Sequence, residues 1–219
     1  MRPAAVLFDC DGVLADSEGL VNAVVAEDLT ARGWRLSAAE CQEIFLGMSA
    51  PAMLPVIEAR VGRLPPDWLV EISDRITRAM MGELQPIPGA VAAVRAVAAA
   101  GIPVAVASNA ARAELLAKLR RIGLFEHFTP RIFSFEDVPR PKPAPDIYRA
   151  AAIACGADPA DCVVVEDSLL GARAGIAAGC RVLGLLHATD PSVFRAIGAE
   201  PLAHLDQLPA LLGLAGPGR

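Results

Sequence analysis

Seven polar side chains in this sequence could do chemistry together, because they lie at the ends of short apolar runs or at the start of a helical pattern. They are Asp9, Asp11, Ser108, Asn109, Lys142, Glu166 and Asp167. Carboxylates that converge in one place repel each other, which raises their pKa values unless a cation is present. Oxygen ligands without His or Cys suit Mg²⁺, so the pattern predicts a magnesium site.

These residue types can also hold and transfer a phosphoryl group. A divalent cation and a lysine neutralise the phosphoryl charge, while a serine hydroxyl and backbone N–H groups hold its oxygens. A carboxylate can then attack phosphorus and form an acyl phosphate. Each residue alone has a more ordinary explanation, such as a solvated turn for Asp9 and Asp11, a helix N-cap for Asp167, or a surface position for Lys142. Their joint occurrence in this order favours the phosphoryl site.

The apolar runs predict strands of a parallel sheet, and helical patterns lie between them. The predicted strands are Ala4–Phe8, Pro103–Ala107, Cys162–Val165 and Arg181–Leu186, with a weaker one at Arg131–Phe135. The predicted helices are Ala90–Ala100, Arg112–Ile122, Asp146–Cys155 and Leu169–Ala178. This alternation indicates an α/β fold, a Rossmann-like three-layer core with a parallel sheet. In such a sheet, ligands bind at the carboxyl ends of the strands, where the polar residues fall.

One region, from about residue 19 to residue 82, has helical patterns and no strand-like run. Its predicted helices are Leu20–Ala31, Ala38–Phe45, Ala52–Val61 and Trp68–Met81. We therefore expect an all-helical domain over residues 17–82, inserted into an α/β core domain made of residues 1–16 and 83–219.

Composition excludes several classes of protein. The chain has 219 residues, is 54% hydrophobic and carries a formal net charge of −5, so it is too apolar for a disordered chain and too acidic to favour a nucleic-acid partner. The longest apolar stretch, Ala96–Ala107, contains Gly101 and Pro103 and is shorter than the roughly 20 residues of a spanning helix, so no membrane association is expected. The N-terminal run is too short for a signal peptide, and the five cysteines form no CxxC pair. We therefore expect a cytoplasmic protein.

Four motifs resemble those of the haloacid dehalogenase (HAD) superfamily phosphatases that carry a helical C1-type cap after the first motif. The motifs are Asp9-x-Asp11-Gly12-Val13-Leu14-x-Asp16-Ser17-Glu18, Ser108-Asn109, Lys142 within PKPAPD, and Val163–Ser168 followed by Gly171, Gly175 and Gly179. The resemblance covers nearly the whole chain. It implies that the helical insert is a cap over an active site.

The resemblance also implies a role for each motif residue. Asp9 would be the nucleophile that becomes phosphorylated, and Asp11 would protonate the leaving alcohol and then activate the attacking water. Mg²⁺ would be bound by Asp9, the main-chain carbonyl of Asp11 and Asp167, with Glu166 beside them as a ligand or just behind the ligands. Ser108 and Asn109 would bind the phosphoryl oxygens, and Lys142 would pair with both Asp9 and the phosphate.

Within the superfamily, the sequence points to the branch of β-phosphoglucomutases and sugar-phosphate phosphatases. The dehalogenases lack the second acidic residue of the first motif, whereas this chain has Asp11. Phosphonoacetaldehyde hydrolases use a cap lysine, whereas the lysines here are Lys118 and Lys142. The mutases carry a His after the first motif and an Arg in the cap loop, where this chain has Val21 and Ala50.

We therefore expect a Mg²⁺-dependent phosphatase of a small phosphorylated metabolite, a sugar phosphate or a sugar-acid phosphate such as 6-phosphogluconate. A β-phosphoglucomutase-type phosphotransferase and a non-catalytic protein with the same fold are the alternatives. A monomer is expected, with a dimer as the other option. Substrate choice is expected to lie in the cap, around Glu18, Asn22, Phe45, Leu46 and Met48.

Overall fold

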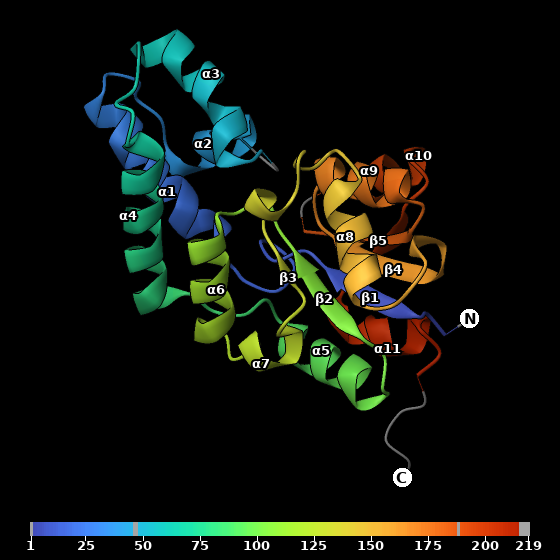
Figure 1. The fold of residues 1–219 in the computed structure, drawn as a ribbon. Coiled ribbons are helices and arrows are strands. Elements are labelled where there is room, and N and C mark those ends of the chain that lie inside the picture. Colours follow the sequence, from blue (N-terminus) through green and yellow to red (C-terminus); the bar gives the residue numbers. More distant parts are fainter. Residues whose placement is uncertain (1, 46–47, 188, 215–219) are drawn as a thin grey trace.

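The sheet of the computed structural model has six parallel strands in the order β3-β2-β1-β4-β5-β6 (Figure 1). The structure describes residues 2–45, 48–187 and 189–214. The strands are β1 (Ala5–Phe8), β2 (Val104–Ala107), β3 (Ile132–Phe133), β4 (Cys162–Glu166), β5 (Arg181–Leu185) and β6 (Glu200–Leu202). The five predicted strands are confirmed to within a residue or two at each end. The sixth, β6, was not predicted.

The α-helices of the described residues include all eight that were predicted. They are α1 (Glu18–Ala31), α2 (Ala38–Phe45), α3 (Ala50–Val61), α4 (Trp68–Glu83), α5 (Ala90–Ala99), α6 (Arg112–Arg121), α7 (Phe125–Phe128), α8 (Asp146–Ala154), α9 (Leu169–Ala178), α10 (Pro191–Ala196) and α11 (Leu208–Leu211). The short helices α7, α10 and α11 were not predicted. Each has six residues or fewer, too few to show a helical period in the sequence.

Alternate side chains of β1 face opposite sides of the sheet and enter two separate buried clusters. Val6 and Phe8 pack in one cluster with residues of α5, α7 and α11. Ala5 and Leu7 pack in the other cluster with residues of α8, α9 and α10. Helices therefore cover both faces of the sheet, which confirms the predicted three-layer α/β fold (Figure 1).

Helices α1 to α4 lie to one side of the sheet, and the chain leaves for them and returns through two neighbouring segments (Figure 1). The N–H of Asp16 donates to the carbonyl of Gln85 at 2.9 Å, and the N–H of Ile87 donates to the carbonyl of Leu14 at 3.0 Å. Side chains of α4 and α6 share one of the buried clusters, so the helical insert packs on the core. The exact division into residues 17–82 and the remainder stays a prediction.

Among the described helices, no single one is long and apolar enough to cross a membrane. Only α2 and α3 together reach the required length and composition, across a bend of 115°.

Candidate active site

The strand register brings the first, second and fourth motifs to one edge of the sheet. Phe8, the last residue of β1, is paired with Val106 of β2 on one side and with Val165 of β4 on the other. By this register Asp9 follows between Ala107, which precedes Ser108, and Glu166, and its own N–H donates to the carbonyl of Val165 at 3.0 Å. Because all the strands are parallel, these residues meet at the carboxyl edge, as the sequence predicts.

Lys142 reaches this edge from the loop before α8 and pairs with two carboxylates. Its Nζ lies 2.5 Å from Oδ1 of Asp9 and 2.6 Å from Oε1 of Glu166. All three side chains are at least nine-tenths buried. Oε1 of Glu166 also accepts a hydrogen bond from the hydroxyl of Tyr148 at 2.8 Å, and Oε2 accepts bonds from the hydroxyl and N–H of Ser168. Glu166 therefore fixes the position of Lys142 between itself and Asp9.

Asn109 holds the Lys142 loop by two hydrogen bonds to its main chain. Its Oδ1 accepts from the N–H of Lys142 at 3.1 Å, and its Nδ2 donates to the carbonyl of Lys142 at 3.3 Å. The predicted phosphoryl-binding residue thus has its side-chain amide directed at another part of the site. The neighbouring Ser108 hydroxyl donates to Oδ2 of Asp11 at 3.2 Å and accepts from the N–H of Ala110 at 3.0 Å.

Three carboxylates at this edge could hold a metal ion. Asp9, Glu166 and Asp167 each offer an oxygen, and these atoms all lie within 4.8 Å of one another. Two glycines make room for the carboxylates. A Cβ on Gly12, whose φ is +73°, would lie 1.9 Å from Oδ2 of Asp167. A Cβ on Gly171 would lie 1.6 Å from Oε1 of Glu166. The chain therefore has glycine where any larger residue would displace one of the clustered acids.

Burial governs the ionisation of these groups. Burial, which outweighs the opposing charge of Lys142, raises the pKa of Asp9 to about 8, and the nearby carboxylates Glu166 and Asp11 add to the rise. Burial alone would lower the pKa of Lys142, but Asp9 and Glu166 more than offset it and hold that pKa above its usual value. The cluster therefore lacks positive charge, which a bound cation would supply.

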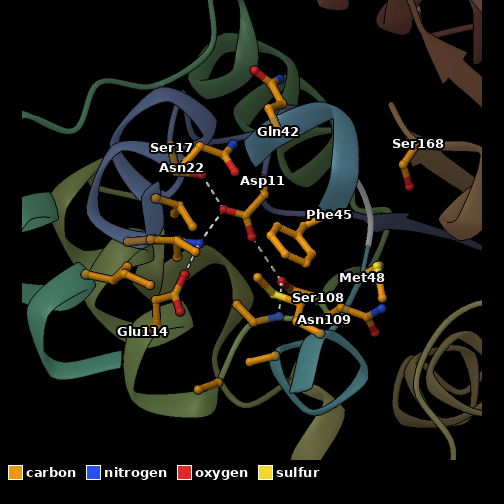
Figure 2. A pocket seen from close by; sticks show the side chains of 18 of the residues that line it. Asp11, Ser17, Asn22, Gln42, Phe45, Met48, Ser108, Asn109, Glu114 and Ser168 are labelled. Carbon is orange, nitrogen blue, oxygen red and sulfur yellow. Dashed lines mark hydrogen bonds and ion pairs between the residues drawn. The ribbon is translucent and has the colours of Figure 1, made fainter. Parts of the chain in front are cut away.

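The side chain of Asp11 points away from the other three acids, toward α6. Its Oδ1 accepts hydrogen bonds from Ser17 Oγ and Lys118 Nζ, while Oδ2 faces Ser108 (Figure 2). Burial opposes ionisation of Asp11, but the charge and hydrogen bond of Lys118, helped by the two serine hydroxyls, lower its pKa below the usual range. The predicted contribution of Asp11 to the metal was its main-chain carbonyl, and this stays a prediction.

From the sequence alone, no role is assigned to Glu114, Lys118 or Tyr148, and none to Ser17, which lies within the first motif. Lys118 is 1% exposed, and its Nζ lies 2.5 Å from Oε1 of Glu114, one turn earlier on α6. In sequence the two look like an ordinary i,i+4 ion pair on a helix surface. The one available signal was composition, since Lys118 and Lys142 are the only lysines among 20 cationic side chains, and both are buried here.

Helices α1 to α3 supply the opposite wall of the pocket. Asn22, Gln42, Phe45 and Met48 line it with Asp11 and Ser108, and Figure 2 shows Phe45 and Met48 beside Asp11, Ser108 and Asn109. Val21 and Ala50 line the same pocket. Three of the predicted substrate-choosing residues therefore reach the site. Leu46, another of them, lies outside the described residues.

Comparisons with known proteins agree on one family. A family model described as haloacid dehalogenase-like hydrolase matches residues 3–179. The 6-phosphogluconate phosphatase of Escherichia coli is 29% identical over 96% of this chain and 95% of its own. The bifunctional riboflavin kinase/FMN phosphatase of Arabidopsis thaliana is 31% identical over 83% of this chain, which spans about half (48%) of that protein. A HAD family hydrolase of Deinococcus radiodurans, solved with bound phosphate and sodium, is 36% identical over 99% of both chains, with a TM-score of 0.77.

Proposed function

Because the chain belongs to the haloacid dehalogenase-like hydrolases, we propose that it is a Mg²⁺-dependent phosphatase of a small phosphorylated metabolite. The observation that carries this proposal is the buried pairing of Lys142 with both Asp9 and Glu166, at 2.5 and 2.6 Å, beside Asp167. One carboxylate in that group is a nucleophile, and the lysine is the fixed positive charge that a phosphoryl group needs.

The residues at the site fit a magnesium ion. The donors are carboxylate oxygens, and three buried or half-buried carboxylates share the single ammonium of Lys142, so a cation would balance their charge. We assign Asp9, Asp167 and the main-chain carbonyl of Asp11 as the ligands. Glu166, with four hydrogen-bond donors already on its two oxygens, stands behind them and orients Lys142. When bound, Mg²⁺ neutralises phosphoryl charge.

In the first step, an Asp9 carboxylate oxygen attacks phosphorus and the ester bond breaks. The Lys142 ammonium lies against Oδ1 of Asp9, so it is placed to hold a phosphoryl oxygen next to the nucleophile. The Ser108 hydroxyl and main-chain N–H groups of the loop that includes Asn109 hold the other oxygens. The anionic phosphate group of the bound substrate favours the protonated form of Asp11. Asp11 then donates this proton to the departing alcohol, and Asp9 is left as an aspartyl phosphate.

In the second step, water attacks the phosphorus of phosphorylated Asp9. The Asp11 carboxylate accepts a proton from this water, so the same side chain is first the acid and then the base. The Asp9–phosphorus bond breaks, inorganic phosphate is released, and the Asp9 carboxylate is restored.

The wall formed by α1 to α3 supports hydrolysis over transfer. A β-phosphoglucomutase must hold a second phosphate in the cap, and the positions at which such enzymes carry His and Arg are Val21 and Ala50 here, both facing the pocket. Neither side chain can bind a phosphate. The amides of Asn22 and Gln42 are suited to hydroxyl groups, so we propose a sugar phosphate or sugar-acid phosphate, such as 6-phosphogluconate, the compound named for the E. coli relative.

The remaining expectations of the sequence stay predictions. They are a cytoplasmic location, a monomer or dimer, and no nucleic-acid or membrane partner.

A phosphatase screen tests the proposal. The purified protein is assayed with a panel of sugar phosphates, sugar-acid phosphates and 4-nitrophenyl phosphate, either with Mg²⁺ in large excess over the enzyme or with EDTA. We expect phosphate release that needs Mg²⁺ and is abolished in Asp9→Asn. Undiminished turnover by that variant would disprove the nucleophile assignment, and isomerisation of β-glucose 1-phosphate without phosphate release would favour the mutase.

A further inference from the structure

Lys118 is a buried cation that the proposed chemistry does not use. It comes from α6, far along the chain from the first motif, and it lies between two carboxylates, Asp11 and Glu114. Its side chain is 1% exposed, and that of Glu114 is 10% exposed. Lys118 and Glu114 both line the pocket, but the Lys118 ammonium is already paired with two carboxylates. A buried lysine held in this way is not a solvated surface charge.

The two oxygens of Asp11 have different partners because of Lys118. Oδ1 accepts hydrogen bonds from the Lys118 ammonium and from the Ser17 hydroxyl. Oδ2 accepts a hydrogen bond from the Ser108 hydroxyl. A carboxylic acid has one proton to place on two oxygens. Two donors, the Lys118 ammonium and the Ser17 hydroxyl, already occupy Oδ1, so Oδ2 is the oxygen left to exchange a proton with another group.

Oδ2 also lies on the side of the proposed phosphoryl site, because Ser108 is the residue expected to hold a phosphoryl oxygen. Figure 2 shows Asp11 between Ser17 and Ser108, with Glu114 on the side away from Ser108. Lys118 thus anchors Oδ1, on the side away from Ser108, and leaves Oδ2 facing Ser108.

We propose that Lys118, held by Glu114, is a positioning residue that fixes Asp11 so that Oδ2 exchanges the proton with the leaving group. This inference rests on the proposed function. In the first step the proton passes from Oδ2 to the ester oxygen while the oxygen–phosphorus bond breaks and the Asp9–phosphorus bond forms. Lys118 does not touch the substrate. It acts through Asp11 alone.

The test compares two esters of similar size that differ in their need for a proton. Phenyl phosphate releases phenol, whose basicity is close to that of the Tyr side chain, with a pKa of about 10. 4-Nitrophenyl phosphate releases a far weaker base that leaves readily as an anion. We measure kcat/KM for both esters with saturating Mg²⁺, because this constant reports the steps up to phosphorylation of Asp9 and not the later hydrolysis.

For Lys118→Met, which keeps the length of the side chain and removes its charge, we expect kcat/KM on phenyl phosphate to fall by about 10²-fold or more. On 4-nitrophenyl phosphate we expect a fall of less than about 10-fold. Glu114→Gln leaves Lys118 with one anchor and is expected to shift the ratio of the two constants in the same direction by a smaller factor. Because it removes one charge without a change in size, it also serves if Lys118→Met fails to fold.

Arg121→Met is the matched control on the same helix. Arg121 ties α6 to α4 through the carbonyl of Gly82 at 3.2 Å and does not line the pocket, so its loss should leave the ratio of the two esters unchanged. Equal losses on both esters in Lys118→Met and Glu114→Gln would show that the pair only stabilises the fold and would overturn the inference. A wild-type protein that hydrolyses neither ester nor any sugar phosphate would instead overturn the proposed function.

Discussion

Asp9 is buried beside two other acids, so its ionisation is costly unless a cation is bound. The pKa of its carboxyl is about 8 in the folded protein, compared with an ordinary value of 3.8. Between these two values the unfolded chain has released the proton and the folded chain still holds it. Stability contributed by Asp9 is therefore complete below about pH 4 and is lost as the pH rises toward 8.

From this we predict that Asp9→Asn stabilises the metal-free protein at alkaline pH. Asn cannot ionise, so the variant does not lose stability as the pH rises. In EDTA at pH 8.5, its melting temperature should exceed that of the wild type by several degrees. The conversion is roughly 2–4 °C per kcal/mol for a chain of this size. At pH 5.5 the difference should be smaller. Asp67→Asn, at an exposed position, is the control and should show no such trend. A difference that is equal at the two pH values would contradict the prediction.

Asn109 determines where Lys142 sits, because both of its amide atoms bond to the main chain of that residue. We predict that Asn109→Ala lowers the free energy of unfolding by about 1–3 kcal/mol, since the freed main-chain groups lose their partners. Phosphatase kcat/KM should fall by at least about 10-fold, through displacement of the Lys142 ammonium. Asn109→Asp keeps one acceptor and should recover part of the stability at neutral pH. A variant with normal kinetics would show that the Lys142 loop is held by other contacts.

At the scale of elements, the start of α9 is packed directly against the site. Gly171 lies in its first turn, where a Cβ would overlap the carboxylate of Glu166, itself bonded to Lys142 and Tyr148. We predict that Gly171→Ala displaces Glu166, lowers the melting temperature and removes most of the activity. Gly82→Ala is the control: it lies in α4 with no atom near its Cβ, and it should leave the protein unchanged or stabilise it by about 0.5–1 kcal/mol. Full activity of Gly171→Ala would contradict the assigned role of Glu166.

The elements that were predicted well from the sequence are those whose burial determines which of their own residues are apolar. Strands β1, β2 and β4 are buried on both faces and read as continuous apolar runs, and the polar residues after them converge because parallel strands end at one edge. Strand β6 has three residues and contains Pro201, so it has neither a run nor a period, and it is an edge strand, where proline is tolerated.

The role of the Lys118–Glu114 pair could not be predicted from the sequence for a different reason. Its spacing on α6 is that of a solvated ion pair, and only the packing of α6 beneath the first motif buries it. The side-chain direction of Asn109 is likewise set by a residue in another loop. Site residues at strand ends can thus be predicted from the order of strands in the sequence. Site residues on a helix, such as Lys118, depend on how that helix packs against the sheet.

For the whole molecule, we predict that Mg²⁺ stabilises the fold in a pH-dependent way. At pH 8, a metal concentration about 100 times its Kd should add about 2.7 kcal/mol, or roughly 5–10 °C in melting temperature. At pH 5.5 the increase should be smaller, because Asp9 still holds a proton that the metal must displace. NaCl at equal ionic strength is the control. An equal effect of Mg²⁺ and NaCl, or an undiminished effect in Asp9→Asn, would argue against a metal site at the cluster.

The paired hydrogen bonds of Asp16 with Gln85 and of Leu14 with Ile87 have a consequence for how the pocket can diversify. The main chain enters and leaves α1 to α4 at adjacent points, so the sheet register and the positions of Asp9, Lys142 and Asp167 do not depend on the length of what lies between. A different segment, longer or shorter, inserted between these two crossing points would replace Asn22, Gln42 and Phe45 together. Replacing this segment would change the residues that line the pocket while Asp9 and Lys142 stay where they are.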